Sequence, residues 1–177
     1  MQRRQFLSNA LASLAGASVL RSAAAAEPAK GSAPATAPAS ASAPIKIEKL
    51  VKTEEEWKKI LTPEQFYVLR KEGTERPYSS ALNNEKRKGT FLCAGCDLPL
   101  FESSTKFESG TGWPSFYRAI DGRLETTVDH KLIYPRTEYH CVRCGGHHGH
   151  LFDDGPAPTG QRYCNNGVAL RFIPKTA

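Results

Sequence analysis

Two short helices are predicted at the start of the folded part of the chain. Thr53 is followed three residues later by Glu56, and Thr62 by Gln65, and each pair forms a capping box that marks a helix N-terminus. Pro63 suits the first position of the second helix. Apolar residues then recur at helical spacing, namely Trp57, Ile60 and Leu61 in the first segment and Phe66, Val68 and Leu69 in the second.

Beyond Gly89 the pattern changes to short apolar and β-branched runs separated by Gly, Pro and Asp. Such runs are typical of strands, and no helical segment recurs between them, so they predict antiparallel sheets. The expected strands cover 90–92, 115–120, 124–128, 132–134, 138–142 and 168–173. We therefore expect a mainly β fold with short N-terminal helices.

The first 44 residues follow neither pattern. Residues 1–26 have a basic start at Arg3 and Arg4, an apolar run, and a small-residue end, which is the layout of an export signal. The Arg pair resembles a twin-arginine signal, with a Sec-type signal as the alternative. The run is too short to span a membrane comfortably, so we expect a periplasmic protein with no stable membrane span after cleavage.

Residues 27–44 are an Ala/Pro/Ser-rich run that predicts a disordered linker. The folded domain is then expected over residues 45–177, which is long enough for one compact core.

Half of the net charge of +6 comes from the export segment. Residues 1–26 hold three Arg and no acid, so without them 24 − 3 = 21 basic residues face 18 acidic ones, a net charge of +3. Binding of nucleic acid needs a concentrated basic face, and a charge this small does not support it. We expect no nucleic-acid partner.

Four of the five cysteines form two Cys-x-x-Cys knuckles, Cys93 with Cys96 and Cys141 with Cys144. The two-residue spacing lets both thiolates of a turn face one ion, and two such turns complete a tetrahedral zinc shell with no open position. We therefore expect one structural Zn²⁺. Two local disulfides or a redox Cys-x-x-Cys are the alternatives, which an exported protein can also hold.

Cys164 has no cysteine partner once the zinc shell is filled. Arg162, two positions earlier, can lie on the same strand face and favour the thiolate. The alternative is a buried structural thiol, because free cysteine is among the most buried residue types.

Three histidines follow the second knuckle. His147 and His150 suit proton transfer near neutral pH. A second, catalytic zinc is another interpretation, but no nearby carboxylates clearly complete it. We expect His148 to cap the knuckle or to face solvent.

Several motifs together resemble those of the peptide methionine-R-sulfoxide reductases, in order and in spacing, over roughly residues 50–174. They are Gly-Thr-Glu-Arg-Pro-Tyr at 73–78, Cys-Ala-Gly-Cys at 93–96, Ser-Gly-Thr-Gly-Trp-Pro-Ser-Phe at 109–116, Cys-Val-Arg-Cys at 141–144 with the His147/His150 pair, and the run 154–166. The resemblance implies a fold of two antiparallel sheets, a structural zinc away from the active site, and repair of oxidised proteins and peptides that contain methionine sulfoxide.

The resemblance also implies a role for each matching residue. Cys164 corresponds to the nucleophile, which attacks the sulfoxide sulfur and becomes a sulfenic acid. Trp113 corresponds to the aromatic wall that receives the substrate methyl group, and Arg162 to the residue near the reactive sulfur. The polar residues around the sulfoxide, one of which supplies a proton from an imidazole, correspond to His147, His150 and Asn166.

Thr111 stands where many members of that family carry a resolving cysteine. We therefore expect no intramolecular disulfide, and reduction of the sulfenic acid by an external thioredoxin-like thiol. A non-catalytic zinc-ribbon interaction module is the main alternative, but it leaves Cys164 without a task. A zinc hydrolase built on the histidines would need a second metal.

Overall fold

In the computed structural model, which describes residues 47–176, both predicted helices form behind their capping boxes. Helix α1 spans Glu54–Ile60 and helix α2 spans Pro63–Lys71. The side chains of Thr53 and Thr62 each accept a hydrogen bond from a backbone N–H of the first turn, and each threonine N–H donates in return to the Glu or Gln at that position. The prediction of two short helices is confirmed.

The predicted export signal (1–26) and linker (27–44) lie outside the described residues. Within residues 47–176, no helix combines the length and the apolar character that crossing a bilayer requires.

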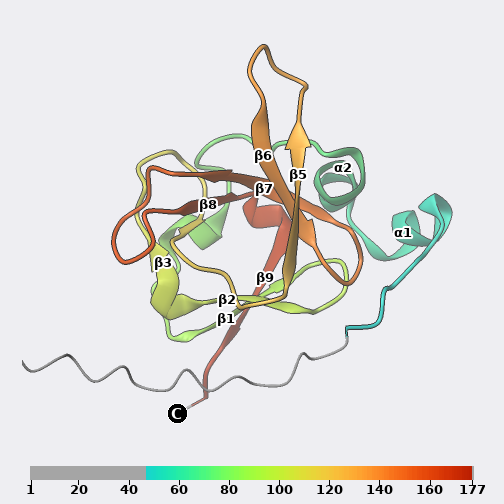
Figure 1. Ribbon diagram of the computed structural model, residues 1–177. Helices are drawn as coiled ribbons and strands as arrows, with labels where there is room; N and C mark the ends of the chain where they lie inside the picture. Colours follow the sequence, from blue (N-terminus) through green and yellow to red (C-terminus); the bar gives the residue numbers. More distant parts are fainter. Residues whose placement is uncertain (1–46, 177) are drawn as a thin grey trace, which may run out of the picture. The chain divides into compact units, whose positions relative to one another are not determined.

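Nine strands of the described residues form two antiparallel sheets (Figure 1). The smaller sheet has the order β2-β1-β9, and the larger has the order β3-β4-β8-β7-β6-β5. The fold prediction, mainly β with two antiparallel sheets, is confirmed. The strands are β1 (Gly89–Cys93), β2 (Pro99–Glu102), β3 (Lys106–Phe107), β4 (Ser115–Phe116), β5 (Leu124–Asp129), β6 (Arg136–Cys141), β7 (His147–Phe152), β8 (Arg162–Asn165) and β9 (Leu170–Pro174). Three short 3₁₀ helices are Ala81–Asn84 (η1), Ser103–Thr105 (η2) and Gly167–Ala169 (η3).

One expected strand is wrong, and others begin or end elsewhere. Residues 132–134 form the turn between β5 and β6, and Ile133 is fully exposed there because no residue of 47–176 packs against it. The expected strand 115–120 ends at Phe116, and 168–173 begins as a 3₁₀ helix before β9. Strands β2, β3, β7 and β8 were not predicted.

The core lies between the two sheets. Phe91 of β1 and Phe101 of β2 are fully buried and meet Phe116 of β4, with ring centroids 4.9 Å and 4.2 Å apart. Tyr139 of β6 packs edge-on against Phe101. Burial of one such ring contributes about 1.5–3 kcal/mol. The core therefore lies against one face of the larger sheet.

Candidate functional site

The register of the larger sheet brings the reactive side chains to one face. Cys164 of β8 lies opposite Ser115 of β4 and opposite His150 of β7, and His150 in turn lies opposite Glu138 of β6. Partners directly opposite each other in a sheet share a face. These side chains therefore form a row across four strands, on the face away from the buried Tyr139.

A β-bulge places His147 on the same face as His150. Residues three apart point to opposite faces of a regular strand. Between His147 and Gly149 the register with β6 advances by only one residue, so His148 is an extra residue in β7. As a result the His147 and His150 rings lie 5.6 Å apart between centroids, in an edge-to-face arrangement.

Each of these two histidines has a carboxylate partner. His147 donates from Nδ1 to Glu138 Oε1 at 2.7 Å, and His150 donates from Nε2 to Asp129 Oδ2 at 2.8 Å. The backbone N–H of Lys131, followed by His150, lowers the pKa of Asp129 below its usual range. Burial lowers the pKa of His147, which keeps this imidazole neutral. Carboxylate partners of this kind fix the tautomer and the ring orientation.

His148 is fully buried, and the expectation that it caps the knuckle or faces solvent is wrong. As the bulged residue it points into the core, where its Nδ1 donates to Asn165 Oδ1 at 3.3 Å. Burial lowers the pKa of His148 to about 4, so it is neutral at ordinary pH. Its role is structural.

A cavity of about 130 Å³ opens beside Cys164. It contains four of the residues predicted from the sequence, Cys164, His150, Trp113 and Asn166. The other lining residues are Thr74, Arg136, Gly149, Phe152 and Asn165. Aromatic surface from Trp113 and Phe152, combined with a thiol and an imidazole, suits a small, mostly apolar group with one polar atom.

Opposing effects act on the Cys164 thiol. Burial raises its pKa above the ordinary value, while the charge of Arg162 and hydrogen bonds from Thr111 and Arg162 lower it. Burial is the largest of these effects. The influence of Arg162 expected from the sequence is therefore present, but it only partly offsets burial.

Arg162 is held rigidly beside the cavity. Its Nε and Nη2 donate to the two carboxylate oxygens of Asp154 at 2.7 and 2.8 Å, which is a bidentate pair. Its guanidinium lies 4.3 Å from the ring centroid of Phe152. Arg162 and His147 do not line the cavity; each stands next to a residue that does.

Glu75 connects Trp113 with Asn166. The Trp113 indole N–H donates to the Glu75 carbonyl at 3.2 Å, and Asn166 Oδ1 accepts from the Glu75 N–H at 2.9 Å. The Glu75 carboxylate accepts from the backbone N–H groups of Gly167 and Val168 at 2.6 and 2.9 Å. One residue thus fixes the aromatic wall relative to the strand that carries the thiol.

Gly149 allows β7 to approach β8 at the reactive cysteine. A Cβ at this position would lie 1.9 Å from the Cys164 carbonyl oxygen, closer than any real contact. Only glycine fits without moving one of the two strands.

The acids that support the site were not predicted from the sequence. Glu75 lies within the motif at 73–78, so its position in that motif was an available signal. Asp129 and Glu138 carry no local signal, because only the pairing of β5, β6 and β7 brings them to the histidines.

The four knuckle cysteines form a separate cluster that can hold a metal ion. All four Sγ atoms lie within 4.8 Å of one another. The distance is 3.6 Å between the Sγ atoms of Cys93 and Cys144, and also 3.6 Å between those of Cys96 and Cys141. None of the four is in a disulfide. A tetrahedron with metal–sulfur distances of about 2.3 Å has sulfurs about 3.8 Å apart. The cluster fits such a shell and joins the end of β1 to the β6–β7 turn.

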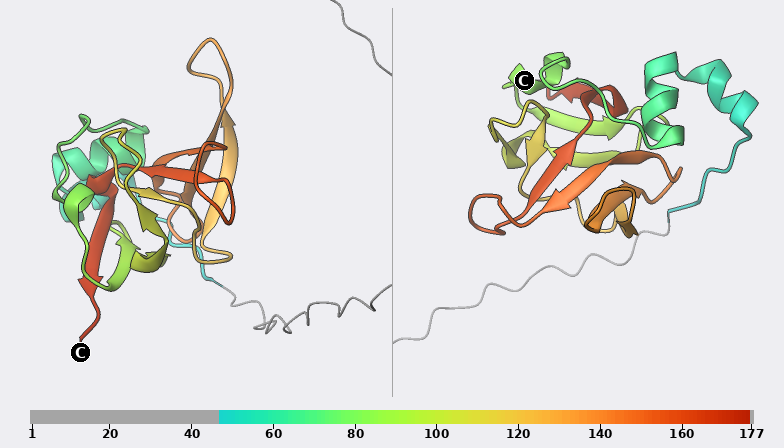
Figure 2. Two further views of the ribbon diagram at one scale, coloured as in Figure 1. Left: turned by 90° about the vertical axis from the view of Figure 1, so that its left-hand side faces the viewer. Right: turned by 90° about the horizontal axis from the view of Figure 1, so that it is seen from above.

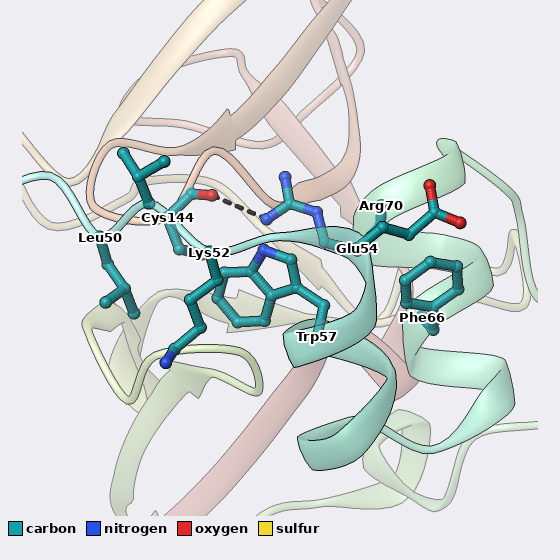
Figure 3. A pocket seen from close by; sticks show the side chains of 8 residues that line it. Leu50, Lys52, Glu54, Trp57, Phe66, Arg70 and Cys144 are labelled. Carbon is teal, nitrogen blue, oxygen red and sulfur yellow. Dashed lines mark hydrogen bonds between the residues drawn. The ribbon is translucent and has the colours of Figure 1, made fainter.

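A second cavity, of about 320 Å³, lies against this cluster (Figure 3). Arg70 donates from Nη1 and Nη2 to the carbonyls of Cys144 and Gly145 at 2.8 and 2.9 Å, and its guanidinium lies 5.0 Å from the Trp57 ring centroid. This cavity shares no lining residue with the one at Cys164. Residues 47–176 therefore carry two distinct sites, a metal cluster and a thiol cavity.

The chain resembles known proteins over most of its described length. Residues 61–174 match the SelR domain family. "Peptide methionine sulfoxide reductase MsrB" of Methanosarcina barkeri is 58% identical over 122 residues, which cover 68% of this chain and 86% of that protein. The protein with the same name from Pseudomonas putida (strain W619) is 53% identical over 132 residues, 73% of this chain and 98% of that protein. "Peptide methionine sulfoxide reductase B1, chloroplastic" of Arabidopsis thaliana is 53% identical over 121 residues, 68% of this chain and 60% of that protein.

Proposed function

The chain belongs to the SelR family, the peptide methionine sulfoxide reductases B, and we propose that it reduces the R epimer of methionine sulfoxide with Cys164 as the nucleophile. The observation that carries this proposal is the cavity in which the Cys164 thiol, the His150 imidazole and the Trp113 indole meet. Methionine sulfoxide has the matching chemistry, because it is apolar except for one sulfoxide oxygen.

The reaction needs a thiolate and one proton. The Cys164 sulfur attacks the sulfoxide sulfur, and the oxygen takes up a proton as the S–O bond weakens. The oxygen then bonds to the Cys164 sulfur as the bonds from the methionine sulfur to that sulfur and to the oxygen break, which leaves Cys164 as a sulfenic acid and releases methionine. The sulfoxide is thereby reduced by two electrons, and the thiol is oxidised by two.

We assign the proton to His150. It lines the cavity, whereas His147 stands behind it and is held neutral by burial. Asp129 orients the His150 ring by accepting a hydrogen bond from its Nε2. Glu138 holds His147, and this pair forms the wall behind His150.

Trp113 and Asn166 orient the substrate. The indole, fixed by its hydrogen bond to Glu75, offers a flat apolar surface to the S-methyl group. The two epimers exchange the places of methyl and oxygen, so a fixed wall on one side and an imidazole on the other favour a single epimer.

We propose Zn²⁺ as the ion of the cysteine cluster. Four thiolates with no open position are the donor set of a structural zinc site. The ion would join the two sheets and take no part in the reaction, because the thiol cavity shares no lining residue with the cavity beside the cluster.

An external thioredoxin-like thiol would reduce the Cys164 sulfenic acid. The four other sulfurs lie together in the cluster, and Thr111, beside Cys164, offers a hydroxyl instead of a thiol. Trapping the oxidised enzyme and finding an internal Cys164 disulfide by mass spectrometry would refute this route.

Export to the periplasm through the twin-arginine pathway is also proposed, from Arg3, Arg4 and the apolar run after them. Replacing both arginines with lysine should retain the precursor in the cytoplasm of a host cell. Unchanged export of that variant would favour a Sec-type signal.

The reductase activity is tested on separated R and S epimers of N-acetyl-methionine sulfoxide with dithiothreitol as reductant. We expect turnover of the R epimer only, and loss of turnover in Cys164→Ser with the fold and the metal retained. Activity on the S epimer alone, or no activity, would overturn the assignment. Activity retained in Cys164→Ser would exclude the proposed nucleophile.

A further inference from the structure

The β5–β6 hairpin presents unpartnered apolar side chains to solvent. Leu132, Ile133 and Tyr134 in its turn are 49%, 104% and 65% exposed. The hairpin projects beyond the rest of the described structure, as Figure 1 and Figure 2 show. We refer to residues 130–135 as the hairpin tip.

The strand residues directly next to the hairpin tip belong to the proposed active site. Asp129 ends β5 and Arg136 begins β6, and Arg136 Nη2 donates to Asp129 Oδ2 at 2.6 Å. The same Asp129 oxygen accepts from His150, and Arg136 lines the thiol cavity. The tip therefore stands on residues that border the cavity, and a chain leaving the cavity past Arg136 comes close to it.

We propose that the hairpin tip binds apolar side chains that flank the methionine sulfoxide in an extended segment of the oxidised protein. This inference rests on the proposed reductase function. Apolar groups exposed next to a substrate cavity gain free energy when a partner covers them, and a polypeptide seated in the cavity brings that partner with it.

The distance from the cavity to the hairpin tip determines which substrate residues the tip can contact. Ile133 is three residues from Arg136, and at about 3.3 Å per residue it lies at most roughly 10 Å from the cavity edge. An extended substrate advances by the same distance per residue. The tip therefore meets residues three to four positions from the methionine sulfoxide, and a single modified amino acid does not reach it.

Charge and size favour this occupant over a membrane or a second copy. Lys131 is paired with Glu72, and Arg136 with Asp129, so the cations beside the tip are largely neutralised, whereas anionic lipid attracts free basic residues. A stable dimer buries about 800 Å² on each partner, and three side chains are too few for that.

The test uses two nine-residue peptides with a central methionine R-sulfoxide. One carries leucine three and four positions from the sulfoxide on both sides, and the other carries serine there. Wild-type enzyme should prefer the leucine peptide in kcat/KM by roughly fivefold to tenfold, the effect of covering one or two apolar side chains. The triple variant L132S/I133S/Y134S should bring this ratio close to one, and the single variant Ile133→Ser should at least halve it.

The ratio is measured within each enzyme, so a general loss of activity cancels. Ile60→Ser is the matched control, because Ile60 is 56% exposed on α1 and should leave the preference as in wild type. A wild-type ratio of one, or a ratio retained in the tip variants, overturns the proposal.

Two further outcomes also decide against it. Vesicles of phosphatidylglycerol and phosphatidylethanolamine that bind wild type but not the triple variant, with the peptide ratio unchanged, would assign the tip to a membrane. A dimer in sedimentation that the triple variant dissociates, again with an unchanged ratio, would assign it to a second copy. Failure of wild type to reduce N-acetyl-methionine R-sulfoxide would refute the reductase function itself, and with it this inference. If wild type is active but its kcat/KM is the same for the leucine and serine peptides, only the inference is refuted.

Discussion

At the level of single residues, burial and the charge of Arg162 have opposite effects on the protonation of the Cys164 thiol. Burial disfavours its thiolate, and Arg162 favours it. Because burial is the larger effect, the pKa of the thiol lies above its ordinary value in the free enzyme, and reactivity should rise with pH. Arg162, whose charge and hydrogen bond both lower the pKa of the thiol, is the main residue that opposes burial.

Replacing Arg162 with methionine should therefore raise the pKa of the Cys164 thiol further and move its alkylation profile to higher pH. Loss of a charge-assisted contact of this kind should lower kcat/KM near neutral pH by roughly ten- to hundredfold. Iodoacetamide alkylation followed across pH measures the shift. Arg171→Met, at an exposed arginine paired with Asp97, is the control and should leave the profile unchanged. An unshifted profile in the Arg162 variant would show that Arg162 does not act on the thiol.

Asp129→Asn should weaken His150 as the proton donor, because the imidazole loses the carboxylate that orients its ring. We expect kcat on the R epimer to fall by roughly a hundredfold, as for loss of general acid catalysis. Thr126→Val, at an exposed position of the same strand opposite Tyr139, is the control. A loss of kcat matched by an equal loss of folded enzyme in circular dichroism would assign Asp129 to folding alone.

At the level of the elements, the bulge in β7 and the close approach of β7 to β8 make the site. The sequence predicted the helices well, because a capping box is a local signal that the tertiary structure did not override. Strands β7 and β8 were missed because His-His-Gly-His and Arg-Tyr-Cys-Asn lack apolar alternation, and their polar residues are those of the site. Conversely, the apolar run 132–134 was predicted to be a strand, but in the structure it lies in the turn between β5 and β6.

Gly149→Ala tests the contact between these two strands. The added methyl group would lie 1.9 Å from the Cys164 carbonyl oxygen, so β7 and β8 must separate. We expect the free energy of unfolding to drop by about 2 kcal/mol or more and R-epimer turnover to be largely lost. Gly95→Ala, where the nearest atom is 3.6 Å away, should shift the urea midpoint much less. Equal midpoints in the two variants would contradict the predicted strain.

At the level of the whole molecule, the cysteine cluster ties the smaller sheet to the larger one. Its spacing made it predictable from the sequence, since two knuckles suffice to define the donor set. The thiol cavity was predictable only as a set of residues. Its geometry depends on Glu75, Asp129 and Glu138, which long-range pairing brings to the site.

Cys96→Ser should lower the metal content and the melting temperature while leaving the residues of the thiol cavity in place. A structural metal contributes directly to the free energy of folding, so we expect a loss of roughly 10 °C or more. Elemental analysis should give one zinc per wild-type chain. Exchanging His147 and His150 for asparagine should not alter that number, and a second histidine-dependent zinc would revive the hydrolase interpretation.

The two tryptophans of the chain are divided between the two sites. Trp57 lies beneath Arg70 beside the cysteine cluster, and Trp113 lines the thiol cavity. Each indole is therefore a built-in optical probe of a different event. In Trp57→Phe the remaining fluorescence should follow oxidation of Cys164, and in Trp113→Phe it should follow release of the metal, so both processes can be recorded in real time without an added label.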